Sequence, residues 1–282
     1  MPPPRFSRRT ALRTAAAVCA GTGLYAWQVE PHWAAVTQRV IPLANLPTEL
    51  VGRRLVHLSD LHLGPVRTSY LAARLRQVAA LSPWLTVITG DFLTVKHQVA
   101  PTAAAELLRH LNPETNRTLA VFGNHDYGAG WCDTAQADQL AGELSAVGVR
   151  VLRNESLDCD GLQVVGLDDL WAGRCDVAKT LEDVAPDRPA VALLHNPDGL
   201  DRPGWDNFHG WVFSGHTHGG QVRPPFLPPP LLPVRNRRYT SGHLDLGDGR
   251  QVYINRGLGY TTQVRFNVRP EIGVFELQRD FS

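Results

Sequence analysis

Five short polar clusters in the sequence contain residue types that bind divalent metal ions. In chain order they are Asp60-Leu61-His62, Gly90-Asp91, Gly123-Asn124-His125-Asp126, His195 and Gly215-His216-Thr217-His218-Gly219-Gly220. Aspartate carboxylates, histidine imidazoles and the carbonyl group of asparagine are ligands suited to Mn, Fe or Zn. Two such cations about 3.5–4 Å apart can activate a water molecule and hold the oxygens of a phosphoryl group. The clusters therefore predict a site for two divalent metal ions, and we favour Mn among the three.

Each cluster on its own also has an ordinary structural explanation. Asp-x-His and Gly-Asp are common in turns and caps, whereas Gly-Asn-His-Asp and Gly-His-Thr-His-Gly-Gly are more specific. The arrangement along the chain is more informative, because every cluster follows an apolar segment. Without cations, several aspartates and histidines in one crevice would meet like-charge and desolvation penalties. One shared metal site is therefore the stronger interpretation.

The apolar segments before the clusters are typical of buried β-strands. We predict these strands at residues 54–58, 85–88, 118–122, 190–194 and 211–213, with a further strand at 163–166. Helical periodicity occurs at residues 69–81, 102–111 and 134–147. Loops at the carboxyl ends of strands in an α/β sheet converge on one crevice, so the five clusters should meet in space.

The C-terminal part of the chain has a different pattern. Residues 224–233 are rich in proline, which lacks the N–H that helix interiors and sheet ladders require, so we predict a loop there. Strands without intervening helices follow at residues 239–246, 251–255 and 272–277. This change predicts a single α/β domain, residues 53–282, whose second sheet is mainly antiparallel.

The ordered pattern Asp-x-His, Gly-Asp, Gly-Asn-His-Asp, His and Gly-His-x-His resembles that of the calcineurin-like metallophosphoesterase superfamily. The resemblance extends over roughly residues 53–278. It implies an α/β fold, a four-layer α/β/β/α sandwich of two mixed sheets flanked by helices. It also implies a hydrolase that acts on phosphoric ester bonds.

The same resemblance assigns a role to each residue of the pattern. One metal ion is expected on Asp60, His62 and His218, the other on Asn124, His195 and His216, and Asp91 is expected to bridge both. The resemblance further implies that His125 contacts the phosphate and protonates the leaving group. Asp126 is then expected to orient the imidazole of His125.

The first thirty residues are typical of an export signal. Arg5, Arg8 and Arg9 precede the apolar residues 11–27. Ser7-Arg8-Arg9-Thr10-Ala11-Leu12-Arg13 resembles the twin-arginine signature and departs from it at Ala11, where phenylalanine is usual. The apolar stretch is shorter than the ~20 residues of a comfortable membrane span, so a cleaved signal and an uncleaved anchor both stay open.

This signal predicts the location and the boundaries of the protein. We expect a twin-arginine-type signal or anchor in residues 1–30 and a connecting segment in residues 31–52. Export by the twin-arginine translocation machinery would place the domain in the periplasm or on the outer face of the cytoplasmic membrane. The net charge of +1 gives no sign of a nucleic-acid partner.

The cysteine spacing excludes two kinds of site. Cys19, Cys132, Cys159 and Cys175 contain no Cys-x-x-Cys pair, which argues against a zinc ribbon or a thioredoxin-like redox pair. A disulfide among the last three is compatible with export, but the sequence does not select a pairing.

The end of the chain narrows the resemblance further. Asn255-Arg256-Gly257-Leu258-Gly259 and Arg269-Pro270-Glu271-Ile272 look most like an exported or membrane-associated bacterial phosphodiesterase subfamily. A phosphodiester or phospholipid-like substrate is therefore expected. Two alternatives share the same core, a hydrolase of the UDP-diacylglucosamine pyrophosphate and a phosphomonoesterase. Because every expected ligand is present, a non-enzymatic scaffold is disfavoured.

Two further segments have open roles. Residues 221–239 follow the last metal-binding motif and contain the apolar residues Phe226, Leu227, Leu231 and Leu232, then Arg235, Arg237 and Arg238. This loop either contacts lipid head groups or an amphiphilic phosphodiester, or packs on its own domain. Asp168 and Asp169 follow a strand and lie either near the site or in an ordinary turn.

Overall fold

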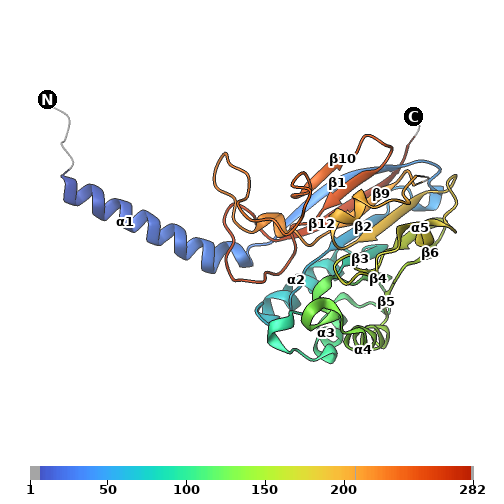
Figure 1. Cartoon of the computed structure of the whole chain (residues 1–282), viewed down its shortest axis with the longest axis horizontal. Coiled ribbons are helices and arrows are strands. Elements are labelled where there is room, and N and C mark those ends of the chain that lie inside the picture. The colour runs from blue at the N-terminus through green and yellow to red at the C-terminus, as the bar shows by residue number, and fades with distance from the viewer. Residues whose placement is uncertain (1–6, 207, 281–282) are drawn as a thin grey trace.

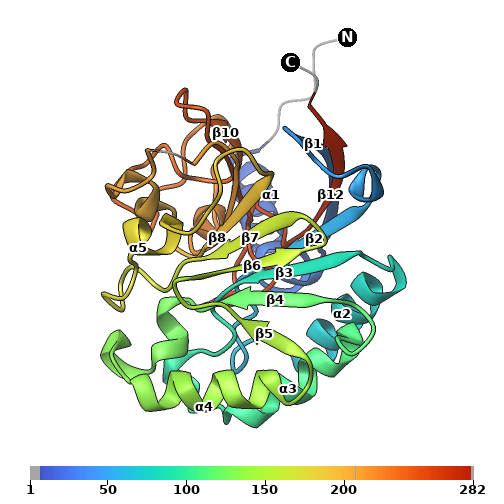
Figure 2. The same cartoon turned by 90° about the vertical axis from the view of Figure 1, so that its right-hand side faces the viewer.

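Alternate side chains of the short apolar strands face two different apolar layers. In β3 (Leu85–Thr89), Leu85 and Val87 lie between the two sheets, whereas Ile88 faces the helices. A strand buried on both faces carries apolar residues at nearly every position, because successive side chains point to opposite faces. The computed structural model, which describes residues 7–206 and 208–280, therefore contains two sheets packed face to face (Figures 1 and 2).

Within the described residues, each sheet has six strands. The first has the order β1 (Ala35–Leu43), β12 (Glu271–Arg279), β2 (Arg54–Leu58), β3, β4 (Thr118–Val121) and β5 (Val149–Val151). The second has the order β10 (Gly242–Asp245), β11 (Gln251–Ile254), β9 (Trp211–Ser214), β8 (Ala190–Leu194), β7 (Leu162–Gly166) and β6 (Glu155–Cys159). Strands β2, β3 and β4 are parallel, as are β8 and β9, so within each sheet their carboxyl ends lie at one edge.

Helices cover the outer faces of both sheets. On the first sheet lie α2 (Thr68–Ala80), α3 (Pro101–Leu108) and α4 (Thr134–Ser145), and on the second lies the short α5 (Val177–Leu181) (Figure 2). Helix α2 buries Leu71, Leu75 and Val78, which share one helical face. The order helix, sheet, sheet, helix confirms the predicted four-layer sandwich.

The prediction that the second sheet is mainly antiparallel is wrong. The pairs β11–β9, β9–β8 and β8–β7 are parallel, and the pairs β10–β11 and β6–β7 are antiparallel. The strand-only end of the chain is also divided, because β12 inserts between β1 and β2 of the first sheet. Pairing between strands that are distant in the chain depends on packing and burial, which local alternation in the sequence does not report.

Residues before position 53 also take part in the fold. Strand β1, within the expected connecting segment, pairs in parallel with β12 from Ala35 opposite Glu271 onward. Residues 26–34, which we call the N-terminal strap, lie on residues 260–270. The N–H of Arg265 donates to the Ala26 carbonyl at 2.8 Å, and the N–H of Val268 donates to the buried Glu30 carboxylate at 2.5 Å. The strap is therefore part of the folded body.

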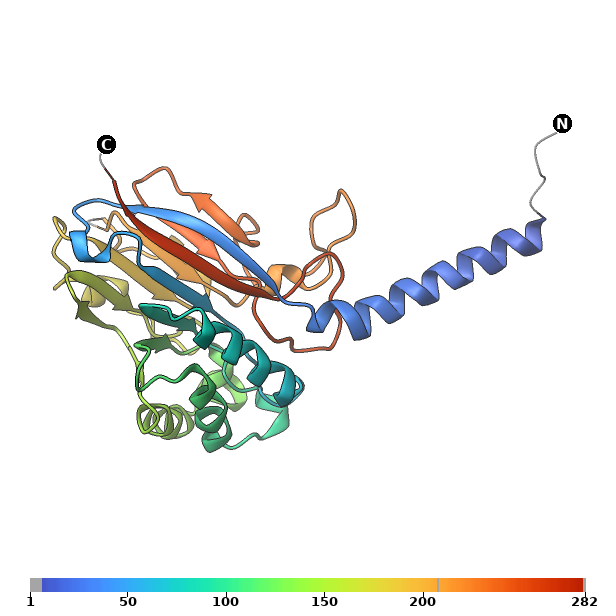
Figure 3. The same cartoon turned by 180° about the vertical axis from the view of Figure 1, so that it is seen from behind.

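Helix α1 (Arg8–Leu24) extends away from this body and buries none of its side chains (Figures 1 and 3). Its first turn is capped by Ser7, whose hydroxyl accepts from the N–H of Thr10 at 3.1 Å. Across residues 7–206 and 208–280, we find no helix with the length and apolar character that a membrane crossing demands. Arg5, part of the predicted signal, lies outside the described residues.

Candidate metal centre

The loops after five strands bring the predicted ligand residues into one crevice. The first sheet supplies Asp60 and His62 after β2, Asp91 after β3 and Asn124 after β4, and the second supplies His195 after β8 and His216 and His218 after β9. All seven side chains are buried. Because the two sheets pack face to face, the carboxyl ends of these strands contribute to the same site.

Five of these residues have a left-handed backbone, which side chains other than glycine rarely adopt. The φ angles are 54° at Asp60, 50° at His62, 55° at Asp91, 68° at His216 and 50° at His218. Each such conformation costs roughly 1–2 kcal/mol and persists only where neighbouring structure holds it. Here the loops hold one another, since the N–H of His62 donates to the Asp91 carbonyl at 3.0 Å. Such strain is concentrated at functional sites.

One group of candidate ligands consists of Asp60, His62 and His218. Nε2 of His218 lies 3.4 Å from Oδ1 of Asp60 and 3.1 Å from Nε2 of His62. One carboxylate and two imidazoles thus direct potential ligand atoms at a common point. This is the set predicted for the first metal ion.

A second group consists of Asp91, His195 and His216. Nδ1 of His216 lies 3.0 Å from Nε2 of His195, which lies 3.4 Å from Oδ2 of Asp91. Beside them, Oδ1 of Asn124 is buried and, among the described residues, has no hydrogen-bond partner. A buried carbonyl oxygen without a partner is unfavourable unless a ligand satisfies it. The donor set therefore fits a divalent cation.

Asp91 belongs to the second group and also lies close to the first. Its Oδ2 is 3.4 Å from Nε2 of His195 and 3.5 Å from Nε2 of His62, which belongs to the first group. The other oxygen, Oδ1, accepts from the N–H of His125 at 3.0 Å, which fixes the carboxylate plane. This is the position that a carboxylate shared by two cations would occupy.

Hydrogen bonds to the second ring nitrogen orient three of the imidazoles. Nδ1 of His195 lies 2.7 Å from the carbonyl of Thr89, and Nε2 of His216 lies 2.9 Å from the carbonyl of Pro233. A carbonyl accepts only, so each of these nitrogens carries the proton and the opposite nitrogen is free to bind a cation. Nδ1 of His62 likewise lies 3.1 Å from the hydroxyl of Thr94.

The electrostatics of the crevice also suit cations. Burial lowers the pKa of both His62 and His216 to about 3, so these rings are neutral at ordinary pH and keep a free lone pair. Burial alone would also lower the pKa of His195, but the Asp91 carboxylate raises it to about 10. Without a cation, a proton on His195 balances the Asp91 charge, and metal binding would replace that proton.

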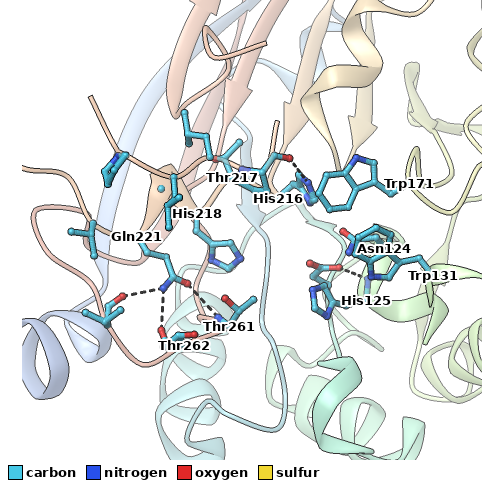
Figure 4. A pocket seen from close by; sticks show the side chains of 18 residues that line it. Asn124, His125, Trp131, Trp171, His216, Thr217, His218, Gln221, Thr261 and Thr262 are labelled. Atoms are coloured by element: carbon cyan, nitrogen blue, oxygen red, sulfur yellow. Dashed lines mark hydrogen bonds between the residues drawn. The ribbon is translucent and has the colours of Figure 1, made fainter. Parts of the chain in front are cut away.

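His125 lies at the edge of this centre. Its ring meets the His62 ring edge to face at 5.0 Å, and it lines the adjacent cavity (Figure 4). The N–H of Val95 points at Nδ1 of His125 at 3.4 Å, which favours the tautomer with its proton on Nε2. A donor N–H beside the candidate ligands suits contact with a phosphoryl or leaving-group oxygen.

The expected contact between Asp126 and the His125 imidazole is replaced by a different one. Within the described chain, Oδ2 of Asp126 accepts from the N–H groups of Asp91 and Gly123, each at 2.9 Å. Its Oδ1 accepts from Phe92 at 2.9 Å and from Leu93 at 3.2 Å. Asp126 therefore ties the loops after β3 and β4 together, and it acts on the site by holding Asp91.

Two aromatic neighbours of the site, Trp131 and Trp171, were not anticipated from the sequence. The rings of Trp131 and Trp171 stack with their centres 4.7 Å apart, and the rings of Trp171 and His216 are nearly perpendicular with their centres 4.4 Å apart. No motif marks either tryptophan in the sequence.

The two aspartates with open roles make hydrogen bonds within the fold. Asp168 accepts from the hydroxyl of Tyr127 at 2.5 Å and from Nε of Arg153 at 3.2 Å. The adjacent Asp169 is buried and accepts from the N–H of Ala172 at 2.7 Å.

Comparison of the sequence with known proteins shows the family to which the chain belongs. Residues 53–220 match the model of the calcineurin-like phosphoesterase family. The chain belongs to that family. This phosphoesterase is 34% identical to the metallophosphoesterase YkuE of Bacillus subtilis (strain 168), over 97% of its own length and 98% of YkuE. The calcineurin-like phosphoesterases hydrolyse phosphoric esters with divalent metal ions, so the chain is a metal-dependent hydrolase of that class.

Two further relatives have more specific names. The phosphoesterase is 32% identical to the phosphodiesterase YaeI of Escherichia coli (strain K12), over 96% of its length and 99% of YaeI. It is 28% identical to the UDP-2,3-diacylglucosamine pyrophosphatase LpxG of Chlamydia trachomatis serovar D, over 89% of its length and 91% of LpxG. The similarity in each case extends beyond the metal-binding motifs to most of both chains.

Proposed function

We propose that this phosphoesterase is a phosphodiesterase that works with two divalent metal ions, of which Mn is favoured. The position of Asp91 carries the proposal, because its Oδ2 lies at nearly equal distances from a histidine of each ligand group. Asp60, His62 and His218 would hold one ion, and Asn124, His195 and His216 the other. The whole-length similarity to YaeI supports a diester substrate.

Bound divalent cations would supply Lewis-acid stabilisation of phosphoryl charge and lower the pKa of a water ligand. The chain itself orients the reacting groups. His125 lines the cavity and accepts at Nδ1 from Val95, which leaves its Nε2 hydrogen to bond a phosphoryl oxygen or the departing oxygen. The backbone N–H of Asp91 donates to the Asp126 carboxylate, and this hydrogen bond holds Asp91 in place.

Replacement of Asp91 by Asn tests the metal assignment. The amide keeps the size of the side chain but loses the charge that two cations would share. We expect the purified variant to lose bound metal in elemental analysis and to hydrolyse bis-p-nitrophenyl phosphate at least on the order of a hundredfold more slowly. Full activity of this variant would show that the assignment is wrong.

A related candidate is hydrolysis of a lipid-linked pyrophosphate, which the similarity to LpxG favours. A panel assayed with added Mn should separate the candidates. It would contain phospholipids, nucleotides, UDP-linked sugars and a phosphomonoester. Preferential hydrolysis of a UDP-linked sugar would favour this candidate over the phosphodiesterase, and preference for the monoester would contradict both.

We further propose export through the twin-arginine machinery, with the enzyme acting in the periplasm or on the outer face of the cytoplasmic membrane. Arg8 and Arg9 lie in the first turn of the projecting α1. Glu30 of the strap is buried in the folded body, which supports an anchor that is not cleaved off.

Phe226 in the proline-rich loop is fully exposed and lines a second cavity together with Tyr25 at the end of α1. We propose that this loop and α1 contact a membrane surface together. Liposome sedimentation of a Phe226→Ser variant tests this contact, and unchanged binding would contradict a role for the loop.

A further inference from the structure

A cavity of about 570 Å³ opens beside the metal centre. Asp91, Asn124, His125, His216 and His218 form the part of its lining that belongs to the centre (Figure 4). The remaining lining is built from two largely apolar walls. A substrate whose phosphorus lies at the metal centre must therefore place one of its substituents between these walls.

One wall consists of the stacked rings of Trp131 and Trp171. Trp171 is 38% exposed and Trp131 is 36% exposed, so each ring offers an open face or edge. Trp171 also contacts the candidate ligand His216. The aromatic surface therefore begins at the metal centre itself.

The second wall contains Val222, Leu231, Leu232 and Val264, and Figure 4 shows Gln221 and Thr262 on the far side of the cavity from the two tryptophans. The side chain of Gln221 braces this wall, because its amide donates to the carbonyls of Thr262 and Val264, each at 3.0 Å (Figure 4). Leu231 is 78% exposed, so the apolar surface continues from the cavity to the solvent.

No lysine or arginine lines this cavity in the described part of the chain. The arginines that follow the proline-rich loop have other partners. Arg237 donates to the carbonyl of Pro229 at 2.8 Å, and Arg238 donates to the carbonyl of Asp245 at 2.5 Å. Arg235 and Arg202 line a neighbouring cavity, which shares Trp171 with this one and also contains Asp198 and Asp201. A negative group held between the two walls of the main cavity would therefore have no lysine or arginine in the lining around it.

We infer that the substrate is a phosphodiester with a single negative charge that carries a bulky apolar substituent between these two walls. This inference rests on the phosphodiesterase function proposed above. Burial of an apolar group between the walls removes its surface from water, which favours binding roughly in proportion to its area. A second phosphate or a carboxylate in the same place would lose hydration without a compensating partner.

A series of p-nitrophenyl alkyl phosphates tests the apolar preference, because all its members release the same leaving group. We expect kcat/KM to rise by about tenfold or more from the methyl to the octyl ester, assayed with Mn below the concentration at which micelles form. Equal values for both esters would overturn the inference while leaving the phosphodiesterase proposal intact. Absence of hydrolysis throughout the series would overturn both.

Variants of each wall assign the preference to this cavity. Trp171→Ala and Leu231→Ser should each reduce the octyl-to-methyl ratio of kcat/KM by about fivefold or more. Leu227→Ser is the matched control, since Leu227 lies in the same loop and is 59% exposed but does not line the cavity. Leu231→Ser changes an exposed side chain, so it stays informative if Trp171→Ala disturbs the fold. Ratios that match the parent enzyme in both wall variants would overturn the assignment.

A charged probe tests the preference for a single negative charge. The ω-carboxypentyl ester has nearly the length of the hexyl ester but ends in a carboxylate. We expect the kcat/KM of this charged ester to be at least about tenfold lower than that of the hexyl ester. A Leu231→Lys variant, which adds a cation to the wall, should narrow this difference. Equal or faster hydrolysis of the charged probe by the parent enzyme would contradict the inference.

Discussion

Histidines close together in this protein have different chemistry because their surroundings differ. His195 and His216 each donate from one nitrogen to a backbone carbonyl and present the other to the crevice. His57 in β2 is equally buried, but its Nε2 lies 2.8 Å from the Thr89 hydroxyl and its ring packs against Phe213 at 5.1 Å. It lies outside the groups of candidate ligands.

His57 gives a prediction about acid stability. Burial lowers its pKa to about 3, so the folded protein holds it neutral while the unfolded chain binds a proton below its ordinary pKa of about 6.5. The contribution of neutral His57 to the free energy of unfolding is therefore fully present above pH 6.5. It is lost as the pH falls from 6.5 towards 3, and the free energy of unfolding then decreases by up to about 1.4 kcal/mol per pH unit.

Urea unfolding between pH 6 and pH 4 measures this effect. We expect a His57→Gln variant to be less stable at neutral pH but to lose stability with a shallower slope than the parent. His97→Gln, at an exposed position, controls for the removal of a histidine. A slope equal to that of the parent in the His57 variant would rule out this histidine as a source of acid sensitivity.

The residues of the candidate site could be predicted from the sequence better than their contacts could. The candidate ligands could be found because each follows an apolar strand and binds metals by its chemical type. The partners of Asp126 could not, because residue spacing does not determine which neighbour a side chain at a turn will contact. Its four backbone donors come from two loops whose approach is set by the sheet.

Close approach of loops also explains one glycine of the site. A methyl group at Gly123 would collide with Oδ1 of Asp91 and with Cε1 of His195. We expect Gly123→Ala to reduce metal content and activity and to cost about 1–3 kcal/mol in the free energy of unfolding. Elemental analysis and denaturant unfolding measure the two effects.

Gly142 in α4 offers a matched control. A methyl group there meets no atom within 4 Å. Gly142→Ala should therefore stabilise the protein by about 0.5–1 kcal/mol, because alanine favours helix, and should leave metal content unchanged. If Gly123→Ala retained full metal content, the loops after β3 and β4 would not need the approach described here.

Most helices and strands next to the site could be predicted, whereas the edge of the first sheet could not. Burial alternates along most of β1, but the residue types do not follow it, since the apolar Val36 and Val40 are exposed and the polar Thr37 lies on the same face as the buried Ile41 and Leu43. Pro42 further weakens its pattern. Its place depends on pairing with β12, more than 200 residues away, as Ala35 opposite Glu271 shows.

The strap links the beginning of the folded body to residues near its end. Loss of the Glu30 carboxylate would leave the N–H of Val268 buried without an acceptor, so Glu30→Ala should lower the free energy of unfolding by about 1.5–3 kcal/mol. Glu49→Ala, at an exposed position, is the control and should change it by less than about 0.5 kcal/mol. Denaturant unfolding of the two variants and of the parent protein measures both effects. A free energy of unfolding of Glu30→Ala equal to that of the parent would show that the strap does not stabilise the folded body.

The position of β12 between β1 and β2 has a consequence for the timing of synthesis. A ribosome releases β1 and β2 early, yet these two strands cannot complete their sheet until the residues of β12 have been translated. Folding of this domain is therefore delayed until nearly the whole chain is made, because its contacts are distant in sequence. During that interval the newly made α1 is already accessible to any factor that recognises its paired arginines. A chain built in this order can engage such a factor first and fold afterwards.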